Sequence, residues 1–153
     1  MPAVMASNTR AAALVKQLRT TADAFFALLD RIPDDRWSEV DKPRVWSPSK
    51  DAEHVAEGNA LHQWVVRAAL RRKLGQRPVV DRARLTAQFA RREVIALLRE
   101  RTGESISLID ELTDEQLDLP CRLPRTIEDF VKRVLIGHYA THHGDIERKL
   151  RRS

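Results

Sequence analysis

The 153-residue sequence contains one cysteine, Cys121, only five glycines, few aromatic residues and no long apolar run. One cysteine cannot form an intrachain disulfide and has no second thiol for a zinc knuckle or redox pair, so we expect a cytoplasmic protein. No window reaches the ~18 apolar residues of a membrane span, and residues 1–17 lack the pattern of an export signal. Because glycine is scarce and aliphatic residues are frequent, the composition favours an all-α fold over a sandwich or barrel.

Charged residues make up 32% of the chain, and 27 basic residues against 22 acidic ones give a net charge of +5. The two signs are interspersed, which is typical of solvated helix faces. No aromatic–basic interleaving or recognition motif accompanies the positive charge. We therefore rank a nucleic-acid binder third, below an enzyme and an interaction module.

Apolar residues recur every three or four positions in four segments, which predicts helices over roughly residues 14–32, 48–73, 81–112 and 126–150. Ser47-Pro48 opens the second segment with an N-cap hydroxyl and a proline at the first helical position. Thr126, with Asp129 three residues later, resembles a capping box at the start of the fourth. We expect one domain, residues 1–153, folded as a four-helix bundle. Its first and third connections should be long and its second short, as between antiparallel neighbours.

The histidines carry the strongest functional signal. His138 and His142 are four residues apart, so on a helix they lie on one face, one turn apart. His54 lies about six residues into the second segment and His142 about eight residues from the end of the fourth, so antiparallel packing would bring them to the same depth. Three imidazoles with open coordination positions are typical of a catalytic metal site. Zinc, nickel and iron(II) all suit such ligands.

Two alternatives bear on this interpretation. The three histidines could be hydrogen-bonded core residues, because an HxxxH pair also arises by chance. Tyr139 follows His138 where a metalloprotease helix would carry its glutamate, which excludes that class of protease. His62, two turns further along the second helix, is expected to be core or pocket wall.

Three further residues are candidates for the surroundings of the site. Glu57 and Asp145 could bond the second ring nitrogens of the ligands, or could be ordinary solvated acids. Arg101 interrupts the apolar stripe of the third helix, where its guanidinium could bind a substrate carboxylate or pair with Glu104.

Nearly the whole chain resembles the DinB-like superfamily of bacterial four-helix-bundle metalloenzymes. The resemblance rests on Trp46-Ser-Pro-Ser-Lys-Asp-Ala-Glu-His54, on Ile32-Pro-Asp-Asp-Arg-Trp37 before it, and on His138-Tyr-Ala-Thr-His142. It implies that His54, His138 and His142 bind a divalent metal. It also implies an activity: some members are thiol S-transferases that use mycothiol, bacillithiol or glutathione, others are classed as hydrolases, and many have no known activity.

The sequence departs from the family pattern at two places. Lys50 stands where a glutamate is usual in the first turn of the second helix, and Glu57-Gly58-Asn59 replaces a common Asp-x-Glu. Because of the second departure, an inactive member of the family is a further alternative.

We predict a metal-dependent thiol S-transferase or hydrolase that acts on a small-molecule substrate, with no catalytic residue beyond the metal centre. The alternative is a non-catalytic interaction or metal-binding module. We also expect a homodimer, because helical bundles of this size often pair through exposed apolar faces.

Overall fold

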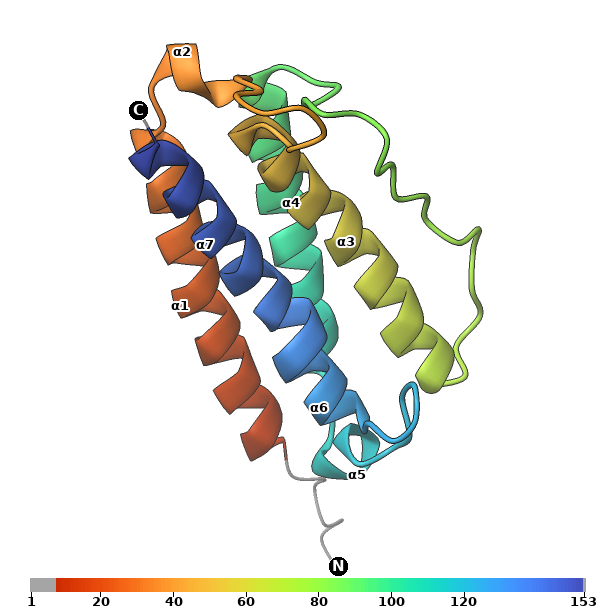
Figure 1. Ribbon diagram of the computed structural model, residues 1–153. Helices are drawn as coiled ribbons and strands as arrows, with labels where there is room; N and C mark the ends of the chain where they lie inside the picture. Colours follow the sequence, from red (N-terminus) through yellow and green to blue (C-terminus); the bar gives the residue numbers. More distant parts are fainter. Residues whose placement is uncertain (1–7, 153) are drawn as a thin grey trace, which may run out of the picture.

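Four long helices pack around one core in the computed structural model, which describes residues 8–152 (Figure 1). They are α1 (Thr9–Arg31), α3 (Pro48–Ala69), α4 (Arg91–Asp110) and a continuous run of α6 (Ile127–Phe130), the π-helical turn η1 (Val131–Ile136) and α7 (Gly137–Arg151). Two single-turn helices, α2 (Asp34–Trp37) and α5 (Asp114–Leu117), lie in the connections. Residues 8–152 contain no β-strand, which confirms the predicted all-α class. None of the described helices is long and apolar enough to cross a bilayer. The predicted domain also includes residues 1–7 and 153, which lie outside the described range.

The helix directions differ from the prediction in one respect. The run from α6 to α7 is antiparallel to α3, as predicted, but α3 and α4 are parallel neighbours (Figure 1). The connection between them, residues 70–90, therefore returns along the full length of the bundle on its outside. The predicted short connection between antiparallel helices is wrong.

The third helix also begins later than predicted, at Arg91 and not near Asp81. Backbone N–H groups of the connection donate to side chains of α3: Asp81 N lies 2.9 Å from Glu57 Oε2, and Gln88 N lies 2.8 Å from Glu53 Oε2. An N–H group bonded in this way is not available for a helical bond to the carbonyl four residues earlier. The α3 carboxylates thus hold the segment in an extended course.

The predicted helix starts at the two capping hydroxyls are confirmed. Ser47 is the N-cap of α3, where its Oγ accepts a hydrogen bond from Lys50 N at 3.3 Å. Thr126 is the N-cap of α6, and its Oγ1 accepts from Asp129 N at 3.2 Å. These caps fix where the two site-bearing helices begin, which sets the height of each histidine along the bundle.

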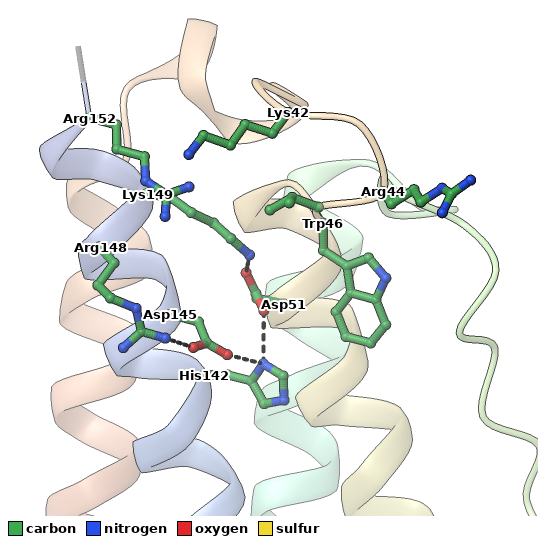
Figure 2. A pocket seen from close by; sticks show the side chains of 10 residues that line it. Lys42, Arg44, Trp46, Asp51, His142, Asp145, Arg148, Lys149 and Arg152 are labelled. Atoms are coloured by element: carbon green, nitrogen blue, oxygen red, sulfur yellow. Dashed lines mark hydrogen bonds and ion pairs between the residues drawn. The ribbon is translucent and has the colours of Figure 1, made fainter.

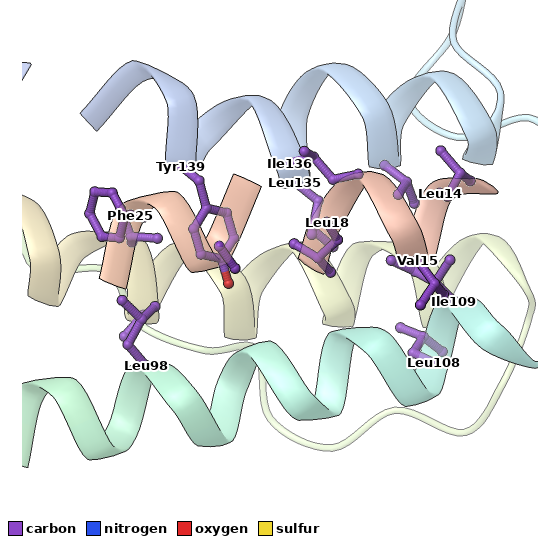
Figure 3. Packing of buried hydrophobic residues seen from close by; sticks show 14 of the residues in the cluster. Leu14, Val15, Leu18, Phe25, Leu98, Leu108, Ile109, Leu135, Ile136 and Tyr139 are labelled. Carbon is purple, nitrogen blue, oxygen red and sulfur yellow. The ribbon is translucent and has the colours of Figure 1, made fainter. Parts of the chain in front are cut away.

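The core joins apolar side chains of all four long helices. Leu14, Leu18 and Phe25 of α1 are buried against α4 and α7 (Figure 3). The Phe25 ring meets Tyr139 edge to face, with ring centroids 5.9 Å apart. Burial of each such side chain contributes roughly 1.5–3 kcal/mol. The packing therefore holds α7, one of the two helices that carry the histidines, in place against α1.

A buried polar cluster lies within this core, between α3, α4 and α7. Asn59 donates to the Tyr139 hydroxyl at 2.7 Å, and Gln63 donates to Ser105 Oγ at 3.0 Å. Thr102 bonds the same tyrosine hydroxyl, and Ser105 bonds Asn59. Burial raises the pKa of Tyr139 to about 12, so its hydroxyl stays protonated. Mutual hydrogen bonding satisfies the cluster, which fixes how the three helices dock.

Candidate metal centre

Three histidines from α3 and α7 meet in the upper half of the bundle. One ring nitrogen from each of His54, His138 and His142 lies within 4.8 Å of the others. The ring centroids of His138 and His142 are 4.6 Å apart. The centroid of the His54 ring lies 4.8 Å from that of His138 and 5.1 Å from that of His142. The structure thus brings together the three residues that the sequence analysis selected. These distances suit three ligands around one small ion.

A glycine on α3 makes room for one of these rings. A Cβ atom at Gly58 would lie 2.4 Å from Cε1 and 2.6 Å from Nδ1 of His138. Contacts this short are prohibitive, so only a residue without a side chain allows the imidazole to lie against the α3 backbone. Gly58, which occupies the unspecified middle position of the family's Asp-x-Glu segment, therefore serves the site directly.

A carboxylate on α3 orients His142. Asp51 Oδ1 lies 2.8 Å from His142 Nδ1, and the Asp51 side chain is only 2% exposed. Lys149 bonds the other carboxylate oxygen (Figure 2). With its Nδ1 proton donated to Asp51, the ring presents Nε2, which faces His138 Nε2 at 3.1 Å. Carboxylate–histidine pairs of this kind are the usual support of a metal ligand.

Asp51 was not among the predicted site residues. It precedes His54 by three positions, so both lie on one face of α3. That spacing was the available signal, but it could not show which histidine the carboxylate reaches. The contact is made to His142, 91 residues away.

The electrostatics of the site favour neutral imidazoles. Burial, followed by the effect of nearby His142, lowers the pKa of His54 from 6.5 to about 4. Burial also lowers the pKa of His138 well below its usual range. The Nδ1 atoms of both rings are buried and make no hydrogen bond within the described residues. Neutral rings with available nitrogens are the form that binds a metal ion, so this donor set fits zinc, nickel or iron(II).

Of the four residues predicted to surround the site, two, His62 and Asp145, lie close to the three histidines. The His62 ring centroid is 5.2 Å from that of His138 and 5.7 Å from that of Phe130, so His62 borders the site on its deeper side. Burial lowers its pKa to about 4. Asp145 Oδ2 lies 3.6 Å from His142 Nδ1, which makes it a more distant neighbour than Asp51.

The other two of these residues, Glu57 and Arg101, bond to residues outside the site. Glu57 accepts from the Asp81 backbone and lies 3.9 Å from Lys50 Nζ, so it holds the 70–90 connection, and within the described structure it has no hydrogen bond or ion pair with a histidine. Arg101 pairs with Glu104 at 2.8 Å, as the alternative interpretation of that residue predicted. Neither contact supports a direct role of Glu57 or Arg101 in the site.

Comparison with known proteins agrees with this architecture. A family model described as the DinB superfamily matches residues 17–146. Among solved structures, the chain is similar to a structural-genomics crystal structure of a protein from Streptococcus pneumoniae, with a TM-score of 0.65 and 15% sequence identity. That match covers 97% of this chain and 92% of the other, and at this identity it shows the fold alone. No curated protein matches the chain.

Proposed function

The chain belongs to the DinB superfamily, and from this premise we propose that it is a metal-dependent enzyme that activates a small thiol or a water molecule toward a small-molecule electrophile. His54, His138 and His142 would hold one divalent ion, either zinc, nickel or iron(II). A divalent ion on three imidazoles supplies Lewis acidity, which makes a thiol or water nucleophilic at neutral pH.

One observation supports the proposal above all others: nitrogens of two buried histidines, His54 and His142, and of the half-buried His138 converge within 4.8 Å, although His54 lies on another helix and far from the other two in sequence. A core that merely tolerated histidines would satisfy their ring nitrogens with hydrogen bonds. Here the Nδ1 atoms of His54 and His138 have none within the described residues, and the same holds for His62, which borders the site. The arrangement is therefore better suited to a ligand than to packing.

The residues around the cluster have separate tasks. Asp51 holds the proton on Nδ1 of His142 and so keeps its Nε2 available. The indole of Trp46 contacts two of the rings, edge-on to His54 with centroids 4.8 Å apart and parallel to His142 with centroids 6.2 Å apart. An apolar ring in this position limits the access of bulk water on that side, which strengthens electrostatic interactions within the site.

The metal content of the purified protein tests the proposal. Protein prepared without added metal, and again after incubation with zinc, nickel or iron(II), should contain about one transition-metal ion per chain by elemental analysis. His54→Ala, His138→Ala and His142→Ala should each lose most of it. His143→Ala is the matched control, because His143 is on the same helix but pairs with Glu147 at 3.1 Å.

Circular dichroism should show that all four variants remain helical. Equal metal content in His138→Ala and His143→Ala, or no stoichiometric metal in the wild type under any of these conditions, would contradict the proposal. The second result would favour a non-catalytic helical-bundle module.

The choice between thiol transfer and hydrolysis needs an activity assay. The metal-loaded protein would be mixed with a model electrophile in the presence and absence of mycothiol, bacillithiol or glutathione. Product formation that depends on one thiol indicates an S-transferase, and thiol-independent product indicates a hydrolase. Either activity should disappear in His138→Ala and persist in His143→Ala.

A further inference from the structure

A cavity of about 530 Å³ lies directly beside the histidine cluster, at the end of the bundle where α7 finishes and α3 begins (Figure 2). His142 and Asp51 form its floor, and Trp46 forms one wall. His142 lines the cavity directly, and the Trp46 ring, which lines it as well, contacts the His54 ring at a centroid distance of 4.8 Å. Its volume is in the range of pockets that bind small organic molecules.

The lining of this cavity has a strong excess of positive charge. Five cationic residues line it, against only two carboxylates, Asp51 and Asp145. Both carboxylates are already engaged, Asp51 by His142 and Lys149 and Asp145 by Arg148. The structure therefore leaves cationic side chains in the wall without an acidic partner from the wall itself.

Two of those cations project over the mouth of the cavity. Lys42 extends from the loop before α3, and Arg152 extends from the end of α7 (Figure 2). Within residues 8–152, neither side chain has an ion pair with a carboxylate. Arg44, from the same loop, points away from the cavity in Figure 2. Two like charges over one concave surface create a positive potential that an anion would relieve.

The chain holds this arrangement in place through another arginine. Arg36 on α2 donates to the carbonyl of Lys149 at 2.7 Å and to that of Arg152 at 3.2 Å. These bonds tie the last turn of α7 to the helix that precedes the Lys42 loop. The backbone that carries Arg152 is therefore anchored, which lowers the conformational entropy lost when a ligand binds.

We propose that this cavity binds the carboxylate or phosphate group of a small molecule. Lys42 and Arg152 donate charge-assisted hydrogen bonds to the anionic oxygens, and the Trp46 ring contacts the organic part of the molecule. The idea that this anion belongs to the substrate rests on the proposed function, because the cavity would hold the anion beside the metal-binding histidines. Anion binding itself does not depend on the metal.

Calorimetric titration of metal-free protein with inorganic phosphate tests the binding. The Lys42→Ala/Arg152→Ala double variant should bind phosphate at least tenfold more weakly than the wild type. The matched control is Lys16→Ala/Arg19→Ala, which removes one lysine and one arginine from the exposed face of α1. Ionic strength must be equal in all titrations, because salt screens exposed charges. Equal affinities for the two double variants, or no binding by the wild type, would overturn the inference.

Two more measurements separate this inference from the proposed function. His138→Ala should bind phosphate like the wild type even if it has lost its metal, so either idea can fail alone. In the activity assay, Lys42→Ala/Arg152→Ala should raise the KM for an anionic electrophile about tenfold and leave that for a neutral analogue unchanged. If the KM values do not separate while phosphate affinity still falls, the anion bound in the cavity is free and not part of the substrate.

Discussion

Neighbouring histidines of this protein have different roles because their surroundings differ. His142 is buried and bonded to Asp51, and its Nε2 lies 3.1 Å from Nε2 of His138. His143 is rotated by about 100° around the helix and pairs with Glu147 at a half-buried position. The same imidazole group is thus a candidate ligand at one position and a surface residue at the next.

Asp51→Asn should weaken metal binding without unfolding the protein. The amide keeps the shape of the carboxylate but loses the negative charge that supports His142, so metal affinity should fall roughly 10- to 100-fold. Competition with a chelator measures the affinity. Asp145→Asn, at 3.6 Å and in a more exposed position, should have a smaller effect. The opposite order of the two variants would show that Asp145 is the residue that orients the ring.

Gly58→Ala should displace the imidazole of His138. The added Cβ would lie 2.4 Å from Cε1, so the ring must move away from α3. We expect at least a tenfold loss of metal affinity in the chelator competition. Gly103→Ala is the control, because its Cβ would meet nothing within 4 Å and should stabilise α4 by roughly 0.5–1 kcal/mol. Unchanged metal affinity in Gly58→Ala would mean that His138 is not a ligand.

Among the elements, the π-helical turn η1 decides how the last helix presents its side chains. A regular α-helical stripe from Ile127 predicts that Val134 is buried and Tyr139 is not. In the structure Val134 is half-buried, while Tyr139 is 0% exposed and lies in the core. A π turn uses more residues per turn than an α turn, which rotates the following helix relative to the preceding one. The rotation lets Tyr139 enter the core while His138 and His142 still reach the site.

The 70–90 connection is the second element with a special role, and its attachment to α3 is testable. Glu53, 2% exposed, accepts from Gln88 N at 2.8 Å and from Phe89 N at 3.2 Å. Glu53→Ala removes both acceptors, so amide hydrogen exchange should become faster in residues 81–90 and stay unchanged in α1. Hydrogen exchange with mass spectrometry measures this difference.

Glu100→Ala is the control for that experiment, because Glu100 is an exposed residue of α4. If exchange in residues 81–90 is equally slow in both variants, other contacts hold the connection. The bond from Ser47 N to the Leu85 carbonyl, at 2.8 Å, would be the first of these.

For the whole molecule, the buried histidines predict how stability depends on pH. Burial lowers the pKa of His62 to about 4 in the folded chain, while the unfolded chain keeps about 6.5. Below pH 6.5 the unfolded state therefore binds a proton that the folded state does not. Stability must fall as pH decreases from 6.5 to 4, and His62 accounts for about 1–2 kcal/mol of the loss at pH 5.

Urea denaturation of metal-free protein at pH 7 and pH 5 measures this effect. In His62→Gln the difference in unfolding free energy between the two pH values should shrink by that amount. An equal pH difference in the wild type and His62→Gln would show that His62 is not held neutral by the fold.

At the same scale, the homodimer and the cytoplasmic location remain predictions from the sequence. Light scattering after size-exclusion chromatography would measure the mass of the particle in solution. Five large apolar side chains are exposed among the described residues, at Val40, Val79, Phe89, Leu119 and Leu123, and they are the first places to look for a contact.

The sequence by itself determined the helical class, the starts of α3 and α6 and the face on which His138 and His142 lie. These features follow from local rules, namely capping hydroxyls and a period of 3.6 residues, and each is visible within a short window. Only the tertiary structure decided that Asp51 supports His142, that Gly58 admits the His138 ring and that residues 70–90 form a long crossover beside parallel α3 and α4. Such contacts depend on which distant residues meet, and in the crossover the α3 carboxylates bind backbone N–H groups that a local pattern assigns to a helix.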